Sequence, residues 1–513
     1  GPPLESDTSR LLKTFTGALA AVQEHYVEPV PTDELVASAV RGLLRTLDPH
    51  SSFFSVSDYN RLQEEQRGRY YGLGITIRAE SPGSGRVAIV EPPSPGTPAY
   101  KVGLRAGDII SRIEGTPIDD WDLNEEVIPH LKGPKGTAVN ITIERPGEPE
   151  PIELAVIRDE ISLYTIKYVF RLDNGIGYVR VNKFSETTGE ELDQALDKLD
   201  EESLKGLVLD LRDNPGGALS QALAVSDRFL RKNQLIVSTR NRSGRGSEFR
   251  AERGSEHEYP MVVLINRNSA SASEIVSGAL QDHDRALIVG ETSFGKALVQ
   301  TIYPLEGNRG LALTTGQYLT PSNRLIQRDY SDSFYEYYLT RSDSPEAESG
   351  DFRTDSGRVV FGGGGITPDE EVRVRRYSNL VRMIDRKRFF IEFATNLVKG
   401  KIQSDIHYQL DREEQLNLSD GQRRQRIEEL KITDETLRLF EDFLRDQEVD
   451  STNGSFQEDR QVIANRLKRE LVLSLFGDEE RFRIALEIDN QLQTAIELLP
   501  EAAALMQKSI AGS

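Results

Sequence analysis

The stretch from residue 261 to residue 300 constrains the fold of this chain more than any other segment. It reads MVVLINRNSASASEIVSGALQDHDRALIVGETSFGKALVQ. The apolar run Met261–Ile265 stops at a polar loop, a small-residue helical pattern follows from about Ser271, and a second apolar run, Ala286–Val289, leads into a glycine turn. This order predicts a strand, a helix and a second strand, which is the repeating unit of an α/β fold.

The same stretch places three serines, Ser269, Ser271 and Ser273, at the strand-to-helix turn and one lysine, Lys296, in a mostly apolar segment. A helix N-terminus presents unpaired N–H groups and a partial positive charge, which stabilise an oxyanion. A lysine can act as a base when burial lowers its pKa. In a strand, Lys296 and Gln300 point the same way, so Gln300 could orient the amine. A lone lysine is also typical of an edge residue that reaches solvent. The residues alone leave the choice of serine and the role of the lysine open.

A second strand-to-helix turn lies upstream, where the apolar run Gly206–Leu211 is followed by the sequence RDNPGG. If the two strands are neighbours in one sheet, the backbone amides of Gly217 and Ala272 come together. Two such donors aimed at one point would form an oxyanion site.

The six histidines supply no obvious base for a serine nucleophile. His50 lies in a proline turn, His257 ends a hydrophilic loop and His283 lies among acids after the predicted helix. We expect all six to be structural or solvated. An ordinary Ser-His-Asp hydrolase remains an alternative, which would require mutation of His283 or His257 to abolish activity. The six are His25, His50, His130, His257, His283 and His407.

The pattern of apolar and polar residues divides the chain into four predicted regions. A helical pattern gives way to short β-like runs, then to alternating strands and helices, then to helical patterns again. Two hydrophilic segments, Arg240–His257 and Arg328–Arg358, are predicted to lack regular structure. The predicted regions are an N-terminal helical region (1–68), a β-rich domain (69–161), an α/β domain (162–376) and a C-terminal helical domain (377–513).

Composition excludes several classes of function. The chain has 63 Lys and Arg against 83 Asp and Glu, a net charge of −20, which disfavours nucleic-acid binding. It has no cysteine, and therefore no disulfide, thiol nucleophile or cysteine metal site. No apolar run is long enough to span a membrane. The opening Gly1-Pro2 resembles a scar of tag cleavage, so we expect that a targeting segment was trimmed.

The β-rich region resembles a PDZ domain of the circularly permuted kind found inside processing proteases. Three motifs carry the resemblance: Gly72-Leu73-Gly74-Ile75, Ser94–Ala99 and Gly103–Ile110. Consecutive N–H groups of Gly72, Leu73, Gly74 and Ile75 are expected to hold a peptide carboxylate, while a strand edge accepts the peptide. Leu73 and Ile75 are expected to line an apolar pocket. By itself the first motif could also be a tight strand entry.

The central stretch resembles the active-site signature of the carboxyl-terminal processing, or tail-specific, protease family, which uses a serine–lysine dyad and embeds a PDZ domain. The resemblance extends from the LDPHSSFF segment to the GITPD segment at 365–369. It implies that Ser271 is the nucleophile, Lys296 the base and Gln300 the support of the lysine. The chain departs from the family pattern at Ala297, where glycine is usual, and in its longer 328–358 segment.

The resemblance also assigns the residues around the dyad. It implies that Gly217 and Ala272 donate to the oxyanion, with supporting roles for Glu274 and Arg212. The expected fold is a crotonase-like α/β protease core with an inserted PDZ domain and helical regions at both ends.

The expected function is that of a serine endopeptidase acting on proteins or peptides with apolar C-terminal tails, without a metal or cofactor. The helical regions are candidates for homo-oligomerisation or for binding an adaptor protein, and the family implies a periplasmic or otherwise exported location. The alternatives are a catalytically silent PDZ-bearing scaffold that binds tails and a carrier of lipophilic ligands. Whether the dyad is assembled at rest depends on the separation of the Lys296 amine from the Ser271 hydroxyl.

Overall fold

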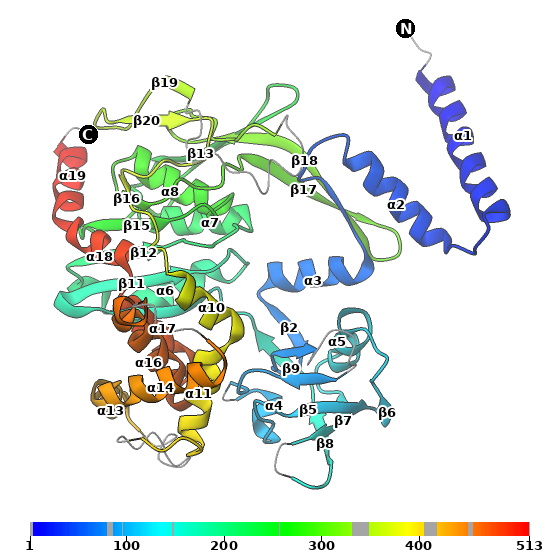
Figure 1. Ribbon diagram of the computed structural model, residues 1–513. Coiled ribbons are helices and arrows are strands. Elements are labelled where there is room, and N and C mark those ends of the chain that lie inside the picture. Colours follow the sequence, from blue (N-terminus) through cyan, green and yellow to red (C-terminus); the bar gives the residue numbers. More distant parts are fainter. Residues whose placement is uncertain are drawn as a thin grey trace.

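The computed structural model describes residues 4–79, 86–94, 96–145, 148–255, 257–330, 348–404, 418–449 and 455–511. A mixed α/β core occupies one side of the molecule in Figure 1, with the β-rich domain and the two N-terminal helices on the other. The C-terminal helices lie against the core.

A six-stranded sheet forms the centre of the core. Its strands run parallel from β11 to β21, and β10 joins the edge in the antiparallel direction. Strands buried on both faces read as continuous apolar runs, which is the pattern of residues 261–265. The strand order is β10 (Ile166–Arg171), β11 (Ile176–Val181), β12 (Gly206–Asp210), β15 (Met261–Ile265), β16 (Leu287–Gly290) and β21 (Glu370–Glu371).

Helices cover both faces of this sheet. One face packs on α6 (Thr188–Lys198), α7 (Leu219–Asp227) and α8 (Ala272–Asp282). The other face packs on α18 (Asn490–Glu497) and α19 (Leu499–Ala511). The predicted strand, helix and strand of residues 261–300 are confirmed as β15, α8 and β16.

The C-terminal helices pack in two places. Those between residues 379 and 486 form a core of their own, rich in phenylalanine. The last two helices instead complete the sheet core through Leu492, Ala495 and Leu499. The first group comprises α10 (Asn379–Lys387), α11 (Phe389–Val398), α13 (Asp420–Glu429), α14 (Asp434–Asp446), α15 (Ser455–Glu458), α16 (Arg460–Phe476) and α17 (Asp478–Leu486).

A second sheet lies beside the core and carries the end of the 261–300 stretch. Its order is β1 (Ser52–Phe54), β18 (Arg309–Leu319), β13 (Leu235–Asn241) and β14 (Glu248–Arg250), and β17 (Leu298–Leu305) also pairs with β18. The prediction of an irregular loop over Arg240–His257 is wrong for the hairpin β13–β14, because pairing of β13 with β18 extends the strand into the charged segment. In the 328–358 segment, the described residues include β19 (Glu348–Arg353), which pairs with β20 (Val359–Gly362), and residues 331–347 lie outside the described ranges.

The β-rich domain has a sheet of its own and two short helical segments. Its strands are β3 (Ile77–Ala79), β4 (Val87–Ile89), β5 (Ile109–Ile113), β6 (Thr116–Pro117), β7 (Ala138–Glu144) and β8 (Ile152–Ile157). The helical segments are α4 (Pro98–Lys101) and the consecutive η1 (Leu123–Val127) and α5 (Ile128–Leu131). A pair of strands, β2 (Arg69–Gly72) and β9 (Asp159–Ser162), connects this domain to the rest of the chain.

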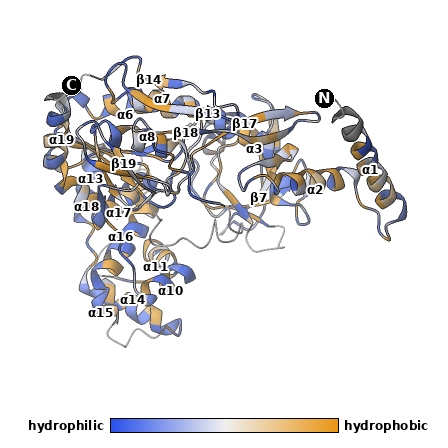
Figure 2. Cartoon of the chain, turned by 90° about the horizontal axis from the view of Figure 1, so that it is seen from above, coloured by the Kyte–Doolittle hydropathy of each residue, from blue (hydrophilic) through white to orange (hydrophobic). Residues whose placement is uncertain are grey.

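Three helices precede it. They are α1 (Leu4–His25), α2 (Thr32–Leu44) and α3 (Val56–Arg67). Helix α1 projects from the molecule in both views, and Figure 2 shows apolar residues along it. Leu11 and Leu12 on this helix are 63% and 59% exposed. No helix in the described ranges combines the length and the apolar character needed to cross a membrane.

Candidate active site

Ser271 lies at the turn between β15 and α8 in an unusual backbone conformation. Its φ is 55° and its ψ is −111°, in a region that a non-glycine residue occupies only when its surroundings hold it there. The Ser271 N–H donates to Glu274 Oε2 at 2.8 Å, and the Ser271 carbonyl accepts from the Tyr318 hydroxyl at 3.1 Å. The backbone on both sides of the serine is therefore fixed.

The three serines of this turn have different environments. Ser269 Oγ donates to the Leu211 carbonyl at 2.8 Å, and Ser273 Oγ donates to the Asn214 carbonyl at 3.0 Å. Both side chains are completely buried. Ser271 is half-buried and takes part in the capping box of α8 with Glu274, but its hydroxyl donates no hydrogen bond to a described residue. Of the three, only Ser271 has a hydroxyl available for chemistry.

Lys296 lies just before β17, half-buried beside the same turn. Its Nζ donates to Gln300 Oε1 at 2.8 Å. Burial lowers the pKa of Lys296 from its ordinary value, and the negative charges of Glu274 and Asp48 only partly oppose this. The amine therefore loses its proton more easily than an exposed lysine would.

Glu274 ties the serine and lysine segments together. Its buried carboxylate accepts from the N–H groups of Ser271 and Lys296 at 2.8 and 2.9 Å, and from Ser293 Oγ and Gly295 N at 2.5 and 2.6 Å. Burial raises the pKa of Glu274, although these four donors oppose the rise. A single side chain on the first turn of α8 thus fixes both segments.

Tyr318, on β18, is a second link between these segments that the sequence did not indicate. Its hydroxyl contacts the carbonyls of Ser271 and Lys296 at 3.1 and 2.5 Å. The side chains of the pair are not joined, because no hydrogen bond connects Lys296 Nζ to Ser271 Oγ in the described part of the chain. The structure therefore holds the two backbones together while the amine is bonded to Gln300.

Gln300 connects the lysine to the N-terminal region. Its Nε2 donates to the His50 carbonyl at 2.6 Å. The turn that presents this carbonyl is held by Asp48, whose Oδ1 accepts from the N–H groups of His50 and Ser51, each at 2.7 Å. Burial and the nearby Lys296 lower the pKa of His50 to about 4, so its ring is uncharged near neutral pH. His50 takes part in the site through its backbone, a role that the sequence did not reveal.

The turn after β12 lies directly against the serine. A Cβ placed on Gly216 would lie 2.8 Å from Ser271 Cβ and 2.9 Å from Ala272 N. At Gly217, φ is 146°, and a Cβ there would lie 2.0 Å from the Phe184 carbonyl oxygen, so both positions require glycine. The N–H groups of Gly217 and Ala272 have no acceptor among the described residues.

Arg212 lies at the start of this turn, but its guanidinium does not contact Ser271 or Lys296. It binds the buried Asp210 carboxylate, with Nη2 to Oδ2 at 2.6 Å, and two residues of the C-terminal region, Asp489 and Gln491. Any supporting role of Arg212 would therefore act through the backbone of the turn.

His283 and His257 lie in structural contacts away from the dyad residues. His283 follows α8, where its Nδ1 lies 2.8 Å from Asp355 Oδ2 and its Nε2 lies 2.7 Å from the Leu235 carbonyl oxygen. His257 Nε2 lies 3.4 Å from Glu201. Because both ring nitrogens of His283 face acceptors, its doubly protonated form fits this position best.

Replacing His283 with glutamine is expected to remove a pH-dependent part of the stability. Burial alone would lower the pKa of His283, but the contacts with Asp355 and the Leu235 carbonyl raise it above 6.5. The stabilisation is fully present below pH 6.5 and is lost as the pH rises through the raised pKa. Between these limits, urea titrations should show a steeper fall of the unfolding free energy in the wild type than in His283→Gln. A His25→Gln control should keep the wild-type slope, and equal slopes in all three proteins would contradict the assignment.

The predicted tail-binding motif lies between β2 and β3 of the β-rich domain. Leu73 is only 2% exposed and packs in the core of that domain, so the expectation that its side chain lines an open pocket is wrong. Ile75 is half-buried, and Gly74 has a φ of 77°. Part of the backbone of the motif is already paired, because Gly72 lies opposite Asp159 of β9 and the Leu73 carbonyl accepts from the Ala99 N–H at 2.9 Å.

In the described part of the chain, no group of three or more His, Asp or Glu side chains is arranged to hold a metal ion.

Comparisons with known proteins give matches in sequence and in structure. Residues 175–331 match the model of peptidase family S41, and residues 89–145 match that of the PDZ domain. The carboxy-terminal-processing protease of Bartonella bacilliformis is 43% identical over 329 residues, which cover 63% of this chain and 74% of the relative. The carboxyl-terminal-processing protease of Synechocystis sp. is 35% identical over 312 residues, 60% of this chain and 72% of the relative.

A solved structure of the photosystem II D1 C-terminal processing protease is also similar. It has 27% sequence identity and a TM-score of 0.36, and the match covers 70% of this chain and 92% of that one. With an identity of 43% across 74% of the Bartonella relative, the chain belongs to the carboxy-terminal processing proteases, serine peptidases of family S41.

Proposed function

We propose that this protease cleaves proteins that it recognises through their apolar C-terminal tails, with Ser271 as nucleophile and Lys296 as base. One observation carries the proposal. Ser271 is the only serine of its turn with an available hydroxyl, and Glu274 and Tyr318 join its backbone to that of a lysine whose pKa is lowered by burial.

The reaction begins with proton transfer from Ser271 Oγ to the neutral Lys296 amine as Oγ attacks the substrate carbonyl. The carbonyl π electrons move to its oxygen, which the N–H groups of Gly217 and Ala272 stabilise. Collapse of the intermediate breaks the peptide C–N bond, and Lys296 returns the proton to the departing amine. Water then attacks the acyl-enzyme, again with Lys296 as base, and releases the acid and free Ser271.

Gln300 holds the amine before this reaction. In the structure Lys296 Nζ donates to Gln300 Oε1, while Gln300 Nε2 is anchored on His50. The amine must exchange or extend this contact to reach Ser271 Oγ. An anchored amide limits the amine to positions near the turn, which favours the productive geometry once substrate is bound.

The other parts of the chain serve recognition and assembly. The motif at 72–75 holds the tail carboxylate with backbone N–H groups, and a strand edge pairs with the peptide. We further propose a crotonase-like core, with domain limits after residues 68, 161 and 376. The exposed apolar residues of α1 support self-association or adaptor binding by the helical regions. A periplasmic or otherwise exported location completes the proposal.

An acyl-enzyme trap tests the proposed chemistry. The protein is mixed with an unfolded reporter that ends in an apolar tail, quenched in acid within seconds and digested for mass mapping. We expect an acyl group on Ser271. Turnover with the acyl group on Ser269 or Ser273 would contradict the assignment, and tail binding without any acyl group or product would favour the scaffold alternative. The His283→Gln variant should be acylated normally, whereas a Ser-His-Asp mechanism requires it to be inactive.

A further inference from the structure

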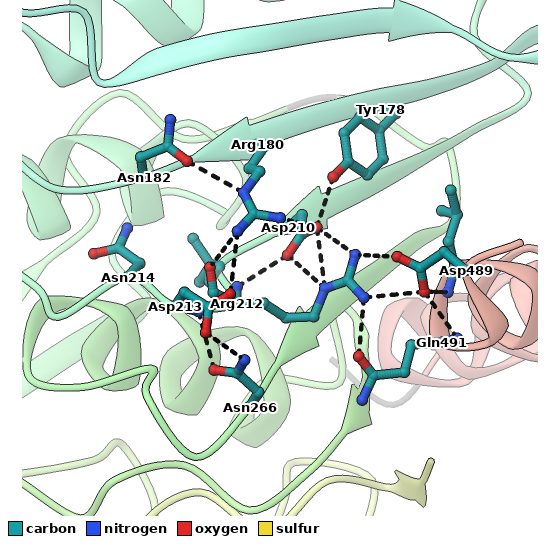
Figure 3. A network of polar contacts seen from close by, with 12 residues as sticks. Tyr178, Arg180, Asn182, Asp210, Arg212, Asp213, Asn214, Asn266, Asp489 and Gln491 are labelled. Atoms are coloured by element: carbon teal, nitrogen blue, oxygen red, sulfur yellow. Dashed lines mark hydrogen bonds and ion pairs between the residues drawn. The ribbon is translucent and has the colours of Figure 1, made fainter. Parts of the chain in front are cut away.

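A buried network of charges lies beneath the turn that precedes Gly217. Figure 3 shows Asp210 between Tyr178, Arg180 and Arg212. Asp210 is fully buried and accepts from the Tyr178 hydroxyl and from Arg212 Nη2, both at 2.6 Å. Arg212 is 7% exposed. A guanidinium this deeply buried needs acceptors for most of its N–H groups.

Asp489 provides further acceptors for the Arg212 guanidinium, on the side that Asp210 does not contact. Its Oδ1 lies 3.1 Å from Arg212 Nη1 and its Oδ2 lies 2.8 Å from Nη2, while Gln491 Oε1 accepts from Nη1 at 2.9 Å. Asp489 follows Arg212 by 277 positions. Two-point contact with a carboxylate fixes the plane of a guanidinium as well as its position.

Asp489 is itself held in place. It caps α18 by accepting from the N–H groups of Gln491 and Leu492 at 3.0 and 3.1 Å. Gln491 Nε2 also donates to the Val372 carbonyl at 2.6 Å, next to β21. The helix that carries these residues packs on the central sheet. The C-terminal segment therefore meets Arg212 as a rigid surface.

Arg212 in turn determines where the oxyanion turn begins. Its N–H donates to Asp210 Oδ1 at 2.9 Å, and its carbonyl accepts from Arg180 at 3.2 Å. The next residue, Asp213, has a φ of 59°, and Asn266 binds its N–H and its carboxylate at 3.0 and 2.9 Å. Asp213 therefore has little freedom to adjust its backbone. A displacement of Arg212 would be passed through Asp213 to Asn214 and to the glycines that follow.

We propose that Asp489 is a positioning residue of the active site, which fixes the Arg212 guanidinium and thereby the turn that presents the Gly217 N–H. The proposal rests on the proposed oxyanion role of Gly217. An oxyanion donor is effective only over a narrow range of distance, so a small shift of the turn weakens catalysis without removing any group that touches the substrate. The C-terminal helix α18 is then part of the catalytic unit.

The test compares Asp489→Asn with Asp478→Asn in the full chain. Asp478, at the start of α17, is a matched control because it is another C-terminal carboxylate that contacts the sheet, accepting from the Tyr168 hydroxyl at 2.5 Å. Its side chain is 49% exposed against 18% for Asp489, and it does not contact Arg212. Turnover of the reporter is measured well below the unfolding midpoint of each protein, with kcat and KM separated.

We expect Asp489→Asn to lower kcat by about 10- to 100-fold with little change in KM, because the donor is lost mainly for the transition state. Asp478→Asn should keep kcat within about 3-fold of the wild type, the range of surface substitutions. Asp489→Glu, which restores a carboxylate, should recover part of the loss. If Asp489→Asn does not fold, Gln491→Met provides the test, with an expected fall in kcat of about 3- to 10-fold from the lost hydrogen bond to Arg212.

A kcat for Asp489→Asn equal to that of Asp478→Asn, or a loss confined to KM, would overturn the inference. So would an unchanged kcat in a folded Gln491→Met when Asp489→Asn is unfolded. Ser271→Ala is measured in the same assay, so that a failure of the proposed function can be distinguished from a failure of the role of Asp489. Turnover by Ser271→Ala would overturn the proposed function itself, whereas an inactive Ser271→Ala beside a fully active Asp489→Asn would overturn only the role of Asp489.

Discussion

Ser271→Ala is expected to lower kcat by at least about 10⁴-fold on an unfolded reporter with an apolar C-terminal tail, because no acyl-enzyme can form. The protein should fold normally, since the Ser271 hydroxyl donates to no described residue and its backbone contacts with Glu274 and Tyr318 do not need the side chain. Tail binding should persist. Product formation followed by mass spectrometry, with circular dichroism to verify folding, checks the result.

Ser269→Ala and Ser273→Ala are the matched controls for this prediction. Each removes a buried hydroxyl that donates to a backbone carbonyl, so each should lower the unfolding free energy by about 1 to 3 kcal/mol. Neither should abolish acylation in the folded protein. If Ser271→Ala turned over substrate and one of the controls did not, the nucleophile would be misassigned.

Lys296→Arg is expected to lower kcat/KM by at least about 10³-fold across the accessible pH range, because a guanidinium cannot accept a proton from Ser271. In the wild type, the acylation rate should rise with pH as Lys296 loses its proton. Burial lowers the pKa of Lys296, so the midpoint of that rise should lie below 10.5. Because the acylation rate depends on the fraction of neutral Lys296, acylation should be lost as the pH falls below the pKa of Lys296.

The measurement is a pH profile of single-turnover acylation for the wild type and Lys296→Arg. Lys198→Arg is the matched control, because Lys198 forms an exposed ion pair with Glu479 and has no other side-chain contact recorded with the described residues. The control should retain the full profile. A Lys296→Arg protein with near wild-type acylation, or a wild-type profile without an acid limb, would exclude Lys296 as the base.

Local patterns account for the part of the fold that the sequence predicted. The alternation of apolar runs and small-residue helix between residues 261 and 290 reports burial directly, and it predicted β15, α8 and β16. The charged hairpin β13–β14 was missed because its strand character comes from pairing with β18, which local composition does not report.

The site was predictable as a set of residues but not as a set of contacts. The acceptors that occupy Ser269 and Ser273 are carbonyls at the end of another strand, so the sequence could not show which serine keeps its hydroxyl. Tyr318, His50 and Asp489 reach the site from distant elements and have no local signature. Tyr318 contacts two backbone carbonyls, whereas His50 and Asp489 contact the side chains of Gln300 and Arg212, and all these contacts follow from the tertiary fold.

The chain leaves the core and returns to it at nearly the same point. Leu163 N donates to the Gly68 carbonyl at 2.7 Å, and the strands β2 and β9 pair from Arg69 with Ser162 to Gly72 with Asp159. Everything between them, the whole PDZ domain included, is an insertion with adjacent ends. Such an insertion perturbs the core little, because four residue pairs of β2 and β9 hold its two ends together and offset the entropy of loop closure. In evolutionary terms, a segment whose ends are adjacent is a position where one domain can replace another without moving Ser271 and Lys296.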